Sequence, residues 1–269
     1  DYADRWTALS AEARDQVKSK VLMTLSSSEP RAGTVAAQVT AAIAAIELPR
    51  GMWPDLVSQL LAAIGDLHNP CQRQAALQAI GFTCEVVDPA VLAAQSNEIL
   101  TAVIQGARKE ETSPEVQLAA LRALLNSLEF VRLNFEREGE RNFIMQVVCE
   151  ATQSPHVAVK VAAFENLVRI MQLYYDKMRF YMEQALFGLT VLGMRDPEPH
   201  VALQAVEFWS TVCDEEIELS LEAAEALEFN EEPAHVSYHF AQIALPEIAP
   251  VLMELLALQD EDTDEDECD

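Results

Sequence analysis

Apolar residues recur at helical spacing through most of the chain, and one stretch of this pattern occurs twice. Residues 113–125 read SPEVQLAALRALL, and residues 154–167 read SPHVAVKVAAFENL. In both stretches a Ser-Pro pair is followed by apolar residues at intervals of three or four, which is typical of an amphipathic helix with proline in its first turn. The pattern therefore predicts a helical unit that repeats along the chain.

Four copies of this unit align on a proline that precedes a helix. The prolines at 70, 114, 155 and 199 lie 44, 41 and 44 residues apart. Each copy then has a small residue and, one turn later on the same face, a large apolar one. These pairs are Ala76 and Ile80, Ala120 and Leu124, Ala163 and Leu167, and Ala205 and Trp209. The third copy has two additional residues between its proline and its alanine. Pro30 is expected to open an earlier copy, with its helix near 34–48.

Other helices are expected between the proline-led ones. They lie at about 53–65, 95–108, 140–153, 178–194 and 238–258. A period of about 40 residues, with two helices in each repeat, is the signature of a HEAT-type α-solenoid. We therefore predict an all-α fold, a right-handed superhelix of antiparallel helix pairs with the proline-led helices on the concave side. Residues 1–269 would form a single segment of about six repeats, with partial repeats at both ends.

Composition agrees with a helical fold and says little about chemistry. Half of the 269 residues are apolar, and only 8 are glycine. The five cysteines form no close pair, so neither a disulfide framework nor a zinc site is expected, and a reducing compartment fits. There is no uncharged apolar stretch of 18 residues, no signal peptide and no initial methionine. We therefore expect a soluble piece of a longer protein that does not insert into membranes.

The net charge of −26 is distributed unevenly. The 74 residues after Arg195 contain 22 of the 44 acidic residues and no Lys or Arg. Because nucleic-acid-binding proteins neutralise phosphates with Lys and Arg, this distribution argues against a nucleic-acid partner and favours a basic protein surface. The run from 259 to 269 is expected to be an acidic loop or tail.

Candidate catalytic patterns are weak. His235 and His239 are four residues apart, but no further ligand stands at metal-binding spacing. Gly188 and Gly193 have the spacing of a phosphate-binding loop, yet the required Lys and Ser or Thr are missing. The sequence therefore predicts neither an enzyme nor a cofactor or metal site.

Two of the expected helices are more apolar than one buried face requires. They read ERNFIMQVVCEA at 140–151 and MRFYMEQALFGLTVL at 178–192. Two explanations remain open at this point. A helix within a solenoid can be covered on three sides, or the junctions between successive outer helices keep shallow apolar pockets that suit aromatic side chains of a flexible ligand.

Long stretches of the sequence closely resemble the importin-beta family of nuclear import receptors, also called karyopherin-beta. The stretches are SNEILTAVIQGARKEE (96–111), ALLNSLEF (123–130), ERNFIMQVVCEATQSP (140–155), RIMQLYYDKM (169–178), ALFGL (185–189), EFWSTVCDEE (207–216) and DEDTDEDECD (260–269). The resemblance extends from Arg5 to the end of the chain, and it implies a HEAT-repeat fragment from the N-terminal half of such a receptor.

The resemblance also implies partners. Members of this family bind phenylalanine-glycine nucleoporins on the convex side. They bind the GTPase Ran in its GTP form and importin-alpha or other basic cargo segments on the concave side. The protein would shuttle between cytoplasm and nucleus through the pore complex at the nuclear envelope. The alternative is a generic HEAT-repeat scaffold of the phosphatase-scaffold or coat-adaptor type. Such a scaffold would share the repeat period and the fold but should not share the aromatic stretches of the outer helices.

The resemblance also places candidate site residues on this sequence. One nucleoporin pocket would use Leu100, Ile104, Phe143 and Ile144, and a second, at the next junction, would use Tyr181 and Leu189. If Ile104 is exposed in its groove, the Ile104→Asp variant should fold normally.

Acidic candidates for binding Ran and the adaptor are distributed over an inner helix and the acidic run. They are Glu207, Asp214, Asp260, Glu261, Asp262, Asp264, Glu265 and Asp266. Glu207, Asp214 and Glu218 would share one helix face, where they could equally be solvated surface charges.

Overall fold

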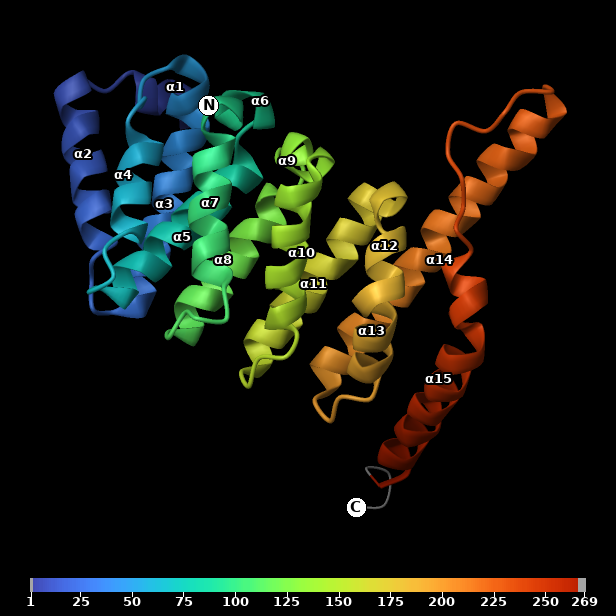
Figure 1. Cartoon of the computed structure of the whole chain (residues 1–269). Coiled ribbons are helices and arrows are strands. Elements are labelled where there is room, and N and C mark those ends of the chain that lie inside the picture. Colours follow the sequence, from blue (N-terminus) through green and yellow to red (C-terminus); the bar gives the residue numbers. More distant parts are fainter. Residues whose placement is uncertain (1, 266–269) are drawn as a thin grey trace. The chain divides into compact units, whose positions relative to one another are not determined.

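The computed structural model describes the backbone of residues 2–265 and the side chains of residues 2–257; these residues form helices and no strands (Figure 1). The helices as far as residue 107 are α1 (Tyr2–Thr7), α2 (Ala11–Thr24), α3 (Pro30–Glu47), α4 (Leu56–Ile64), α5 (Pro70–Val86), α6 (Pro89–Leu92) and α7 (Ser96–Ala107). They are followed by α8 (Pro114–Ser127), α9 (Arg132–Glu136), α10 (Glu138–Ala151), α11 (Val157–Tyr174), α12 (Arg179–Tyr181), α13 (Phe187–Met194), α14 (Pro199–Glu228) and α15 (Phe240–Glu265). Shorter 3₁₀ turns are η1 (Leu48–Arg50), η2 (Ala93–Gln95) and η3 (Tyr175–Lys177), and η4 (Met182–Leu186) is a π-helical turn.

Proline-led helices begin where the sequence pattern predicts. The first residue is the repeat proline in four helices: α3, α5, α8 and α14. The N–H group at this position has no hydrogen-bond partner within a helix, so its absence in proline costs nothing. α11 starts at Val157, two residues after Pro155, so the two additional residues of this copy precede the helix. Ala163 is consequently the seventh helical residue, as the corresponding alanine is in α5, α8 and α14. The repeat is therefore more regular in the structure than in the sequence.

The small and large apolar residues of the repeat lie in the core, as expected. All four alanines are fully buried, and the large residues one turn later are at most 3% exposed. A small side chain followed by a large one lets neighbouring helices approach closely and then interlock. The predicted all-α repeat is confirmed on this point.

The chain divides into two compact units, residues 1–166 and 167–269. In the first unit, α3, α5 and α8 pack side by side, and α2, α4 and α7 each pack against the proline-led helix that follows. α4, α7 and α10 are successive neighbours in the second layer. We call the first helix of each pair its A helix and the proline-led second helix its B helix.

Two asparagines, at different positions of their helices, each donate a hydrogen bond to the preceding B helix. Asn126 Nδ2 donates to the carbonyl oxygen of Gly81 at 3.2 Å, and Asn166 Nδ2 donates to that of Leu121 at 2.9 Å. Each bond joins residues 45 positions apart in the sequence. Polar contacts as well as apolar ones thus join successive B helices.

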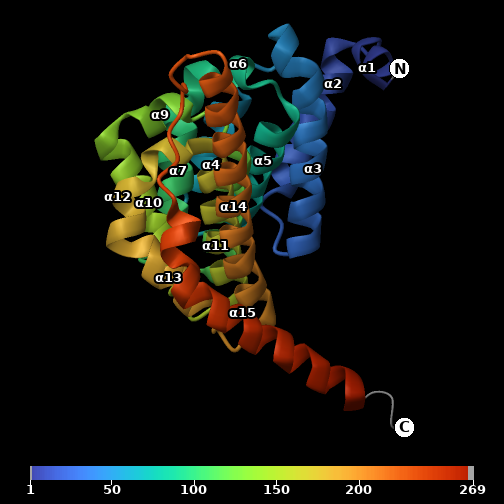
Figure 2. The same ribbon diagram turned by 90° about the vertical axis from the view of Figure 1, so that its right-hand side faces the viewer.

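The second unit contains the end of α11, the turn η3, one longer helix pair and the helix that follows this pair. α12, η4 and α13 run as one A element against α14, and α15 packs against both α13 and α14. α14 is 30 residues long, and the segment from 229 to 239 returns along it before α15 begins (Figures 1 and 2). This return places the start of α15 beside α13.

Two helical stretches, Pro30–Arg50 and Phe240–Ala257, have the length and hydropathy of a membrane-spanning helix. The first of them includes α3, which packs between α2 and α5. Core helices of repeat proteins pass the same test, so these stretches are weak evidence for a membrane segment. The expectation that the chain does not insert into membranes stays a prediction.

The acidic run begins as helix and not as a loop or tail. α15 continues to Glu265, so residues 259–265 are helical, and residues 266–269 lie outside the described part.

Candidate functional site

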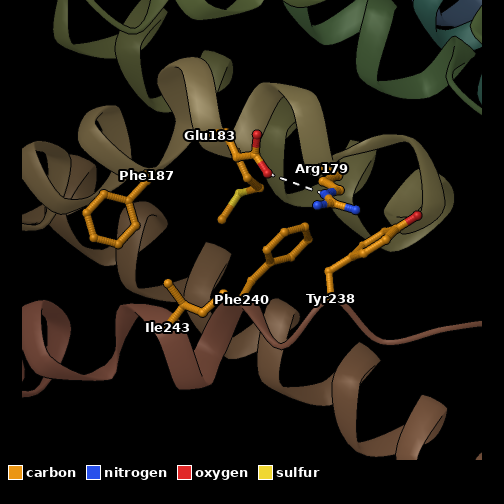
Figure 3. A pocket seen from close by; sticks show the side chains of 7 residues that line it. Arg179, Glu183, Phe187, Tyr238, Phe240 and Ile243 are labelled. Atoms are coloured by element: carbon orange, nitrogen blue, oxygen red, sulfur yellow. Dashed lines mark hydrogen bonds and ion pairs between the residues drawn. The ribbon is translucent and has the colours of Figure 1, made fainter.

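An apolar groove lies in the second unit, between the A element of one repeat and the start of the next A helix (Figure 3). Its volume is about 460 Å³, within the range of ligand-binding sites. The lining side chains are Arg179, Met182, Glu183, Phe187, Tyr238, Phe240 and Ile243. The groove is thus formed by residues about 60 positions apart in the sequence, which the return along α14 brings together.

The groove has an apolar floor and a partly charged rim. Met182 and Phe240 are buried, Phe187 and Tyr238 are half-buried, and Ile243 is 67% exposed. On the rim, Arg179 Nε donates to a Glu183 carboxylate oxygen at 3.3 Å, and both side chains are largely exposed. Such a groove offers apolar contact to a ring and polar groups to the ligand backbone beside it.

One wall of the groove is formed by Tyr238 and Phe240, which pack against Tyr175, a third aromatic residue that does not itself line the groove. Tyr238 stacks on Tyr175 with ring centroids 5.7 Å apart, and Phe240 lies within 5.4 Å of both rings. The Arg179 guanidinium lies 5.8 Å from the centre of the Tyr238 ring, a cation–π contact. Burial, together with the neighbouring Glu216 carboxylate, raises the pKa of Tyr175 well above its usual value, so its hydroxyl stays protonated.

Part of the π-helical turn faces this groove. Met182 and Glu183 belong to η4, and the sequence pattern gave no sign of an interrupted α-helix there. A π turn occurs mostly as a single-turn insertion and is frequent at functional sites. Here it supplies one floor residue and one rim residue.

The first predicted nucleoporin pocket is mostly closed in this structure. Its residues lie on α7 and α10, which are neighbours, but Leu100, Ile104 and Ile144 are at most 7% exposed. Phe143 differs, because 42% of it is exposed. Only 3% of Ile104 is exposed, so the condition under which Ile104→Asp was expected to fold normally is not met in this structure. The role of these four residues in binding stays a prediction.

The second predicted pair does not line the groove of Figure 3. Tyr181 is buried and Leu189 is half-buried on the A element. Phe187, from the 178–192 helix with its excess of apolar residues, does line the groove. Sequence reasoning missed Tyr238 and Phe240; two aromatic side chains at the start of the last expected helix, 238–258, were the available signal.

Acidic candidates on α14 are exposed on one face. Glu207, Asp214 and Glu218 all face solvent. Partial burial raises the pKa of the neighbouring Glu215, and the carboxylates of Glu218 and Asp214 raise it further. This helix therefore carries concentrated negative charge, which favours a basic partner.

The other acidic candidates extend beyond the described side chains. Asp266 lies outside the described residues. The side chains from residue 258 onward are not described either, and they include those of Asp260, Glu261, Asp262, Asp264 and Glu265. Their predicted role is neither supported nor opposed by the geometry.

Metal ligands do not cluster in the part of the chain that the structure describes, where no three His, Cys, Asp or Glu side chains come together. His235 and His239 lie in the segment before α15 and not on a helix face. His235 Nδ1 lies 3.1 Å from a Glu222 carboxylate oxygen and so ties this segment to α14.

Comparison with known proteins gives a consistent result. No protein-family model matches the chain. It is 58% identical over 267 residues to importin subunit beta-1 of Schizosaccharomyces pombe and 47% identical over 269 residues to importin subunit beta-1 of Saccharomyces cerevisiae. Each alignment covers 99% of this chain and 31% of the relative. The chain therefore spans about a third of the length of these relatives.

Solved structures give the same answer. A crystal structure of importin beta in an ammonium sulfate condition matches with a TM-score of 0.87 and 52% identity, over 93% of this chain and 29% of that one. A complex of Kap95 with Nup1 matches with a TM-score of 0.82 and 47% identity, over 95% and 30%. Kap95p studied with RanGDP matches with a TM-score of 0.85 and 46% identity, over 95% and 29%. The predicted HEAT-type α-solenoid is confirmed.

Proposed function

Because the chain belongs to the importin-beta family over 99% of its length, we propose that it is a segment of a nuclear transport receptor. In this proposal it binds proteins and catalyses no reaction. It carries importin-alpha or other basic cargo between cytoplasm and nucleus, and it acts at the pore complex of the nuclear envelope. The membership and the groove together favour this function over a generic HEAT-repeat scaffold.

The groove of Figure 3 is the observation that carries the proposal. A phenylalanine ring of a nucleoporin repeat fits an opening with apolar floor residues such as Met182 and Phe240. A relative, Kap95, has a solved structure in complex with Nup1. Burying one ring contributes at most about 1.5–3 kcal/mol, and ordering a flexible chain offsets part of that.

Weak single contacts suit transport through a pore. A ligand with one ring in the groove dissociates rapidly, whereas several repeats on one receptor give useful avidity. The predicted site around Phe143, which is exposed on α10, would supply a second contact of this kind. The proposal therefore assigns phenylalanine-glycine repeats to the A-helix junctions.

The acidic face of α14 is assigned to basic partners. Exposed Glu207 and Asp214 lie ahead of the acidic run, and no Lys or Arg follows Arg195. Ran in its GTP form and basic adaptor segments are the partners that we propose for this face; a relative, Kap95p, has been studied bound to Ran.

One experiment tests the groove assignment. Ile243 and Leu245 are both exposed on α15, at 67% and 57%, but only Ile243 lines the groove. The Ile243→Asp variant should bind a phenylalanine-glycine repeat peptide at least tenfold more weakly, because a carboxylate would have to lose water beside the ring. The matched Leu245→Asp variant should bind like the original chain. If the two variants bound the peptide with equal affinity, the groove would not be the binding site for the phenylalanine ring.

A further inference from the structure

The start of α15 is held by a buried carboxylate from another helix. Glu216, on α14, is 9% exposed, and its two carboxylate oxygens accept hydrogen bonds from the main-chain N–H groups of Phe240 at 2.5 Å and Ala241 at 3.1 Å. The first N–H groups of a helix have no partner within the helix, and the positive end of the helix dipole favours an anion there. Glu216 therefore caps α15 from outside.

Tyr175 completes this network from η3. Its hydroxyl donates to Glu216 Oε1 at 2.6 Å and accepts a hydrogen bond from the main-chain N–H of Tyr238 at 2.9 Å. Two side chains from other elements thus hold the backbone at Tyr238, Phe240 and Ala241. Neither Tyr175 nor Glu216 lines the groove, whereas Tyr238 and Phe240 do.

The backbone between those two wall residues needs such support. His239 has a φ of 57°, in the left-handed region that residues other than glycine seldom adopt. This residue lies directly between Tyr238 and the first helical residue, Phe240. Without fixed partners for the flanking N–H groups, we expect the segment to sample other conformations and the wall to lose its shape.

We propose that Tyr175 and Glu216 are positioning residues for the groove: they set its affinity for an aromatic side chain without contacting the ligand. The inference rests on the proposed function, because it assumes that the groove binds such a side chain. A preformed wall binds more tightly than one that must be ordered on binding.

The first test removes a single hydroxyl group. The Tyr175→Phe variant keeps the stacked ring but loses the bonds to Glu216 and to the Tyr238 N–H. We expect a phenylalanine-glycine peptide to bind about threefold to tenfold more weakly, and the Tyr238 and Phe240 amides to exchange hydrogen faster. The matched Tyr2→Phe variant, at a residue 85% exposed in α1, should change neither quantity.

The second test removes the charge. In the Glu216→Gln variant a single side-chain oxygen remains to accept from three donors, the Tyr175 hydroxyl and the N–H groups of Phe240 and Ala241. Peptide affinity should therefore fall by at least as much as in the Tyr175→Phe variant. Glu225→Gln makes the same change at an exposed position of α14 and should leave affinity unaltered. In a Glu216→Gln background, adding Tyr175→Phe should cost less than it does alone, because both act through one network.

These outcomes separate the inference from the function on which it rests. If Ile243→Asp weakens binding but Tyr175→Phe leaves both peptide affinity and amide exchange unchanged, the positioning role is wrong and the groove assignment stands. If Ile243→Asp has no effect, the groove assignment fails and the positioning role fails with it. If the Tyr175→Phe variant showed faster amide exchange at Tyr238 and Phe240 but unchanged peptide affinity, Tyr175 would have only a structural role. That result would also overturn the inference.

Discussion

Gly81 of α5 and Ala123 of α8 are in such close contact that a Cβ atom on Gly81 would lie 3.0 Å from the Cα atom of Ala123. The same kind of contact occurs between α3 and α5, where a Cβ on Gly33 would lie 3.2 Å from the Cβ of Ala75. Both pairs are 42 residues apart. Small residues at these two contacts therefore set the spacing of α3, α5 and α8.

We expect the Gly81→Ala variant to be less stable. Added volume against the Ala123 backbone can be accommodated only if α5 and α8 separate, at a cost of about 1–3 kcal/mol, which exceeds the gain of up to about 1 kcal/mol in helix propensity. Gly139→Ala is the matched control, because a Cβ there meets nothing within 4 Å, and it should be neutral or slightly stabilising. Urea unfolding of both variants measures this difference; a more stable Gly81→Ala protein would contradict the packing described.

A buried ion pair between Arg73 and Glu111 should make the first unit sensitive to acid. The two side chains are 10% and 6% exposed, and Arg73 Nη2 donates to a Glu111 carboxylate oxygen at 2.6 Å. Although burial acts to raise the pKa of Glu111, the Arg73 hydrogen bond and the Ser113 N–H lower it overall. The ion pair therefore stabilises the folded protein at pH values above the pKa that the Glu111 carboxyl has in the unfolded chain. This stabilisation is lost as the pH falls through the lower pKa of Glu111 in the folded protein.

Two substitutions check this pair. The Arg73→Met variant should lose about 3–5 kcal/mol at neutral pH, because Glu111 would stay buried without its partner. The Glu111→Gln variant should show a flatter loss of stability between about pH 5 and pH 2 than the original chain. Arg137→Met breaks the exposed pair with Glu140 and serves as the control, with little expected change. An unchanged acid slope in Glu111→Gln would rule out this explanation.

Much of the fold follows from the sequence because its signals are local. Proline in the first turn and the alanine seven positions into each helix are both properties of a single segment. The helix starting at Val157 shows the limit of such signals, since nothing in the sequence states that two residues are inserted before it and not within it. The π turn at 182–186 and the extension of α14 to Glu228 were also missed.

The candidate site was only partly predictable for the same reason. Phe187 belonged to a helix with excess apolar residues, which was visible from the sequence. Its groove partners Tyr238 and Phe240 reach it through the return of the chain along α14 and the turn at His239. The resemblance supplied positions such as Ile104 but not their exposure.

Phe143 and Ile104 should behave differently when substituted. Phe143 is 42% exposed, so Phe143→Ala should weaken binding of a phenylalanine-glycine peptide while leaving the melting temperature nearly unchanged. Ile104 is 3% exposed, so Ile104→Asp would bury a charge and destabilise the first unit by more than about 4 kcal/mol. Thermal melting and peptide titration of each variant check both statements; a normally folded Ile104→Asp protein would show that this site opens in solution.

Association with basic partners should depend on the acidic face of α14. Replacing Glu207 and Asp214 by Gln and Asn removes two exposed charges, so association with Ran in its GTP form should be slower and less sensitive to salt. The same charge change at Glu12 and Asp15, on helix α2 of the first unit, is the control. Stopped-flow association rates at several salt concentrations provide the measurement, and identical salt slopes for both double variants would argue against this face.

Calorimetric titration of the chain with two peptides tests the central claim most directly. One peptide carries phenylalanine-glycine repeats, and the other has the same length and charge with serine in place of each phenylalanine. A transport receptor segment with an apolar groove should bind the first peptide weakly and saturably, with a negative heat-capacity change, and should not bind the second. Equal heats for the two peptides, or no saturable binding of the first, would contradict the assignment of this chain as a nucleoporin-binding segment.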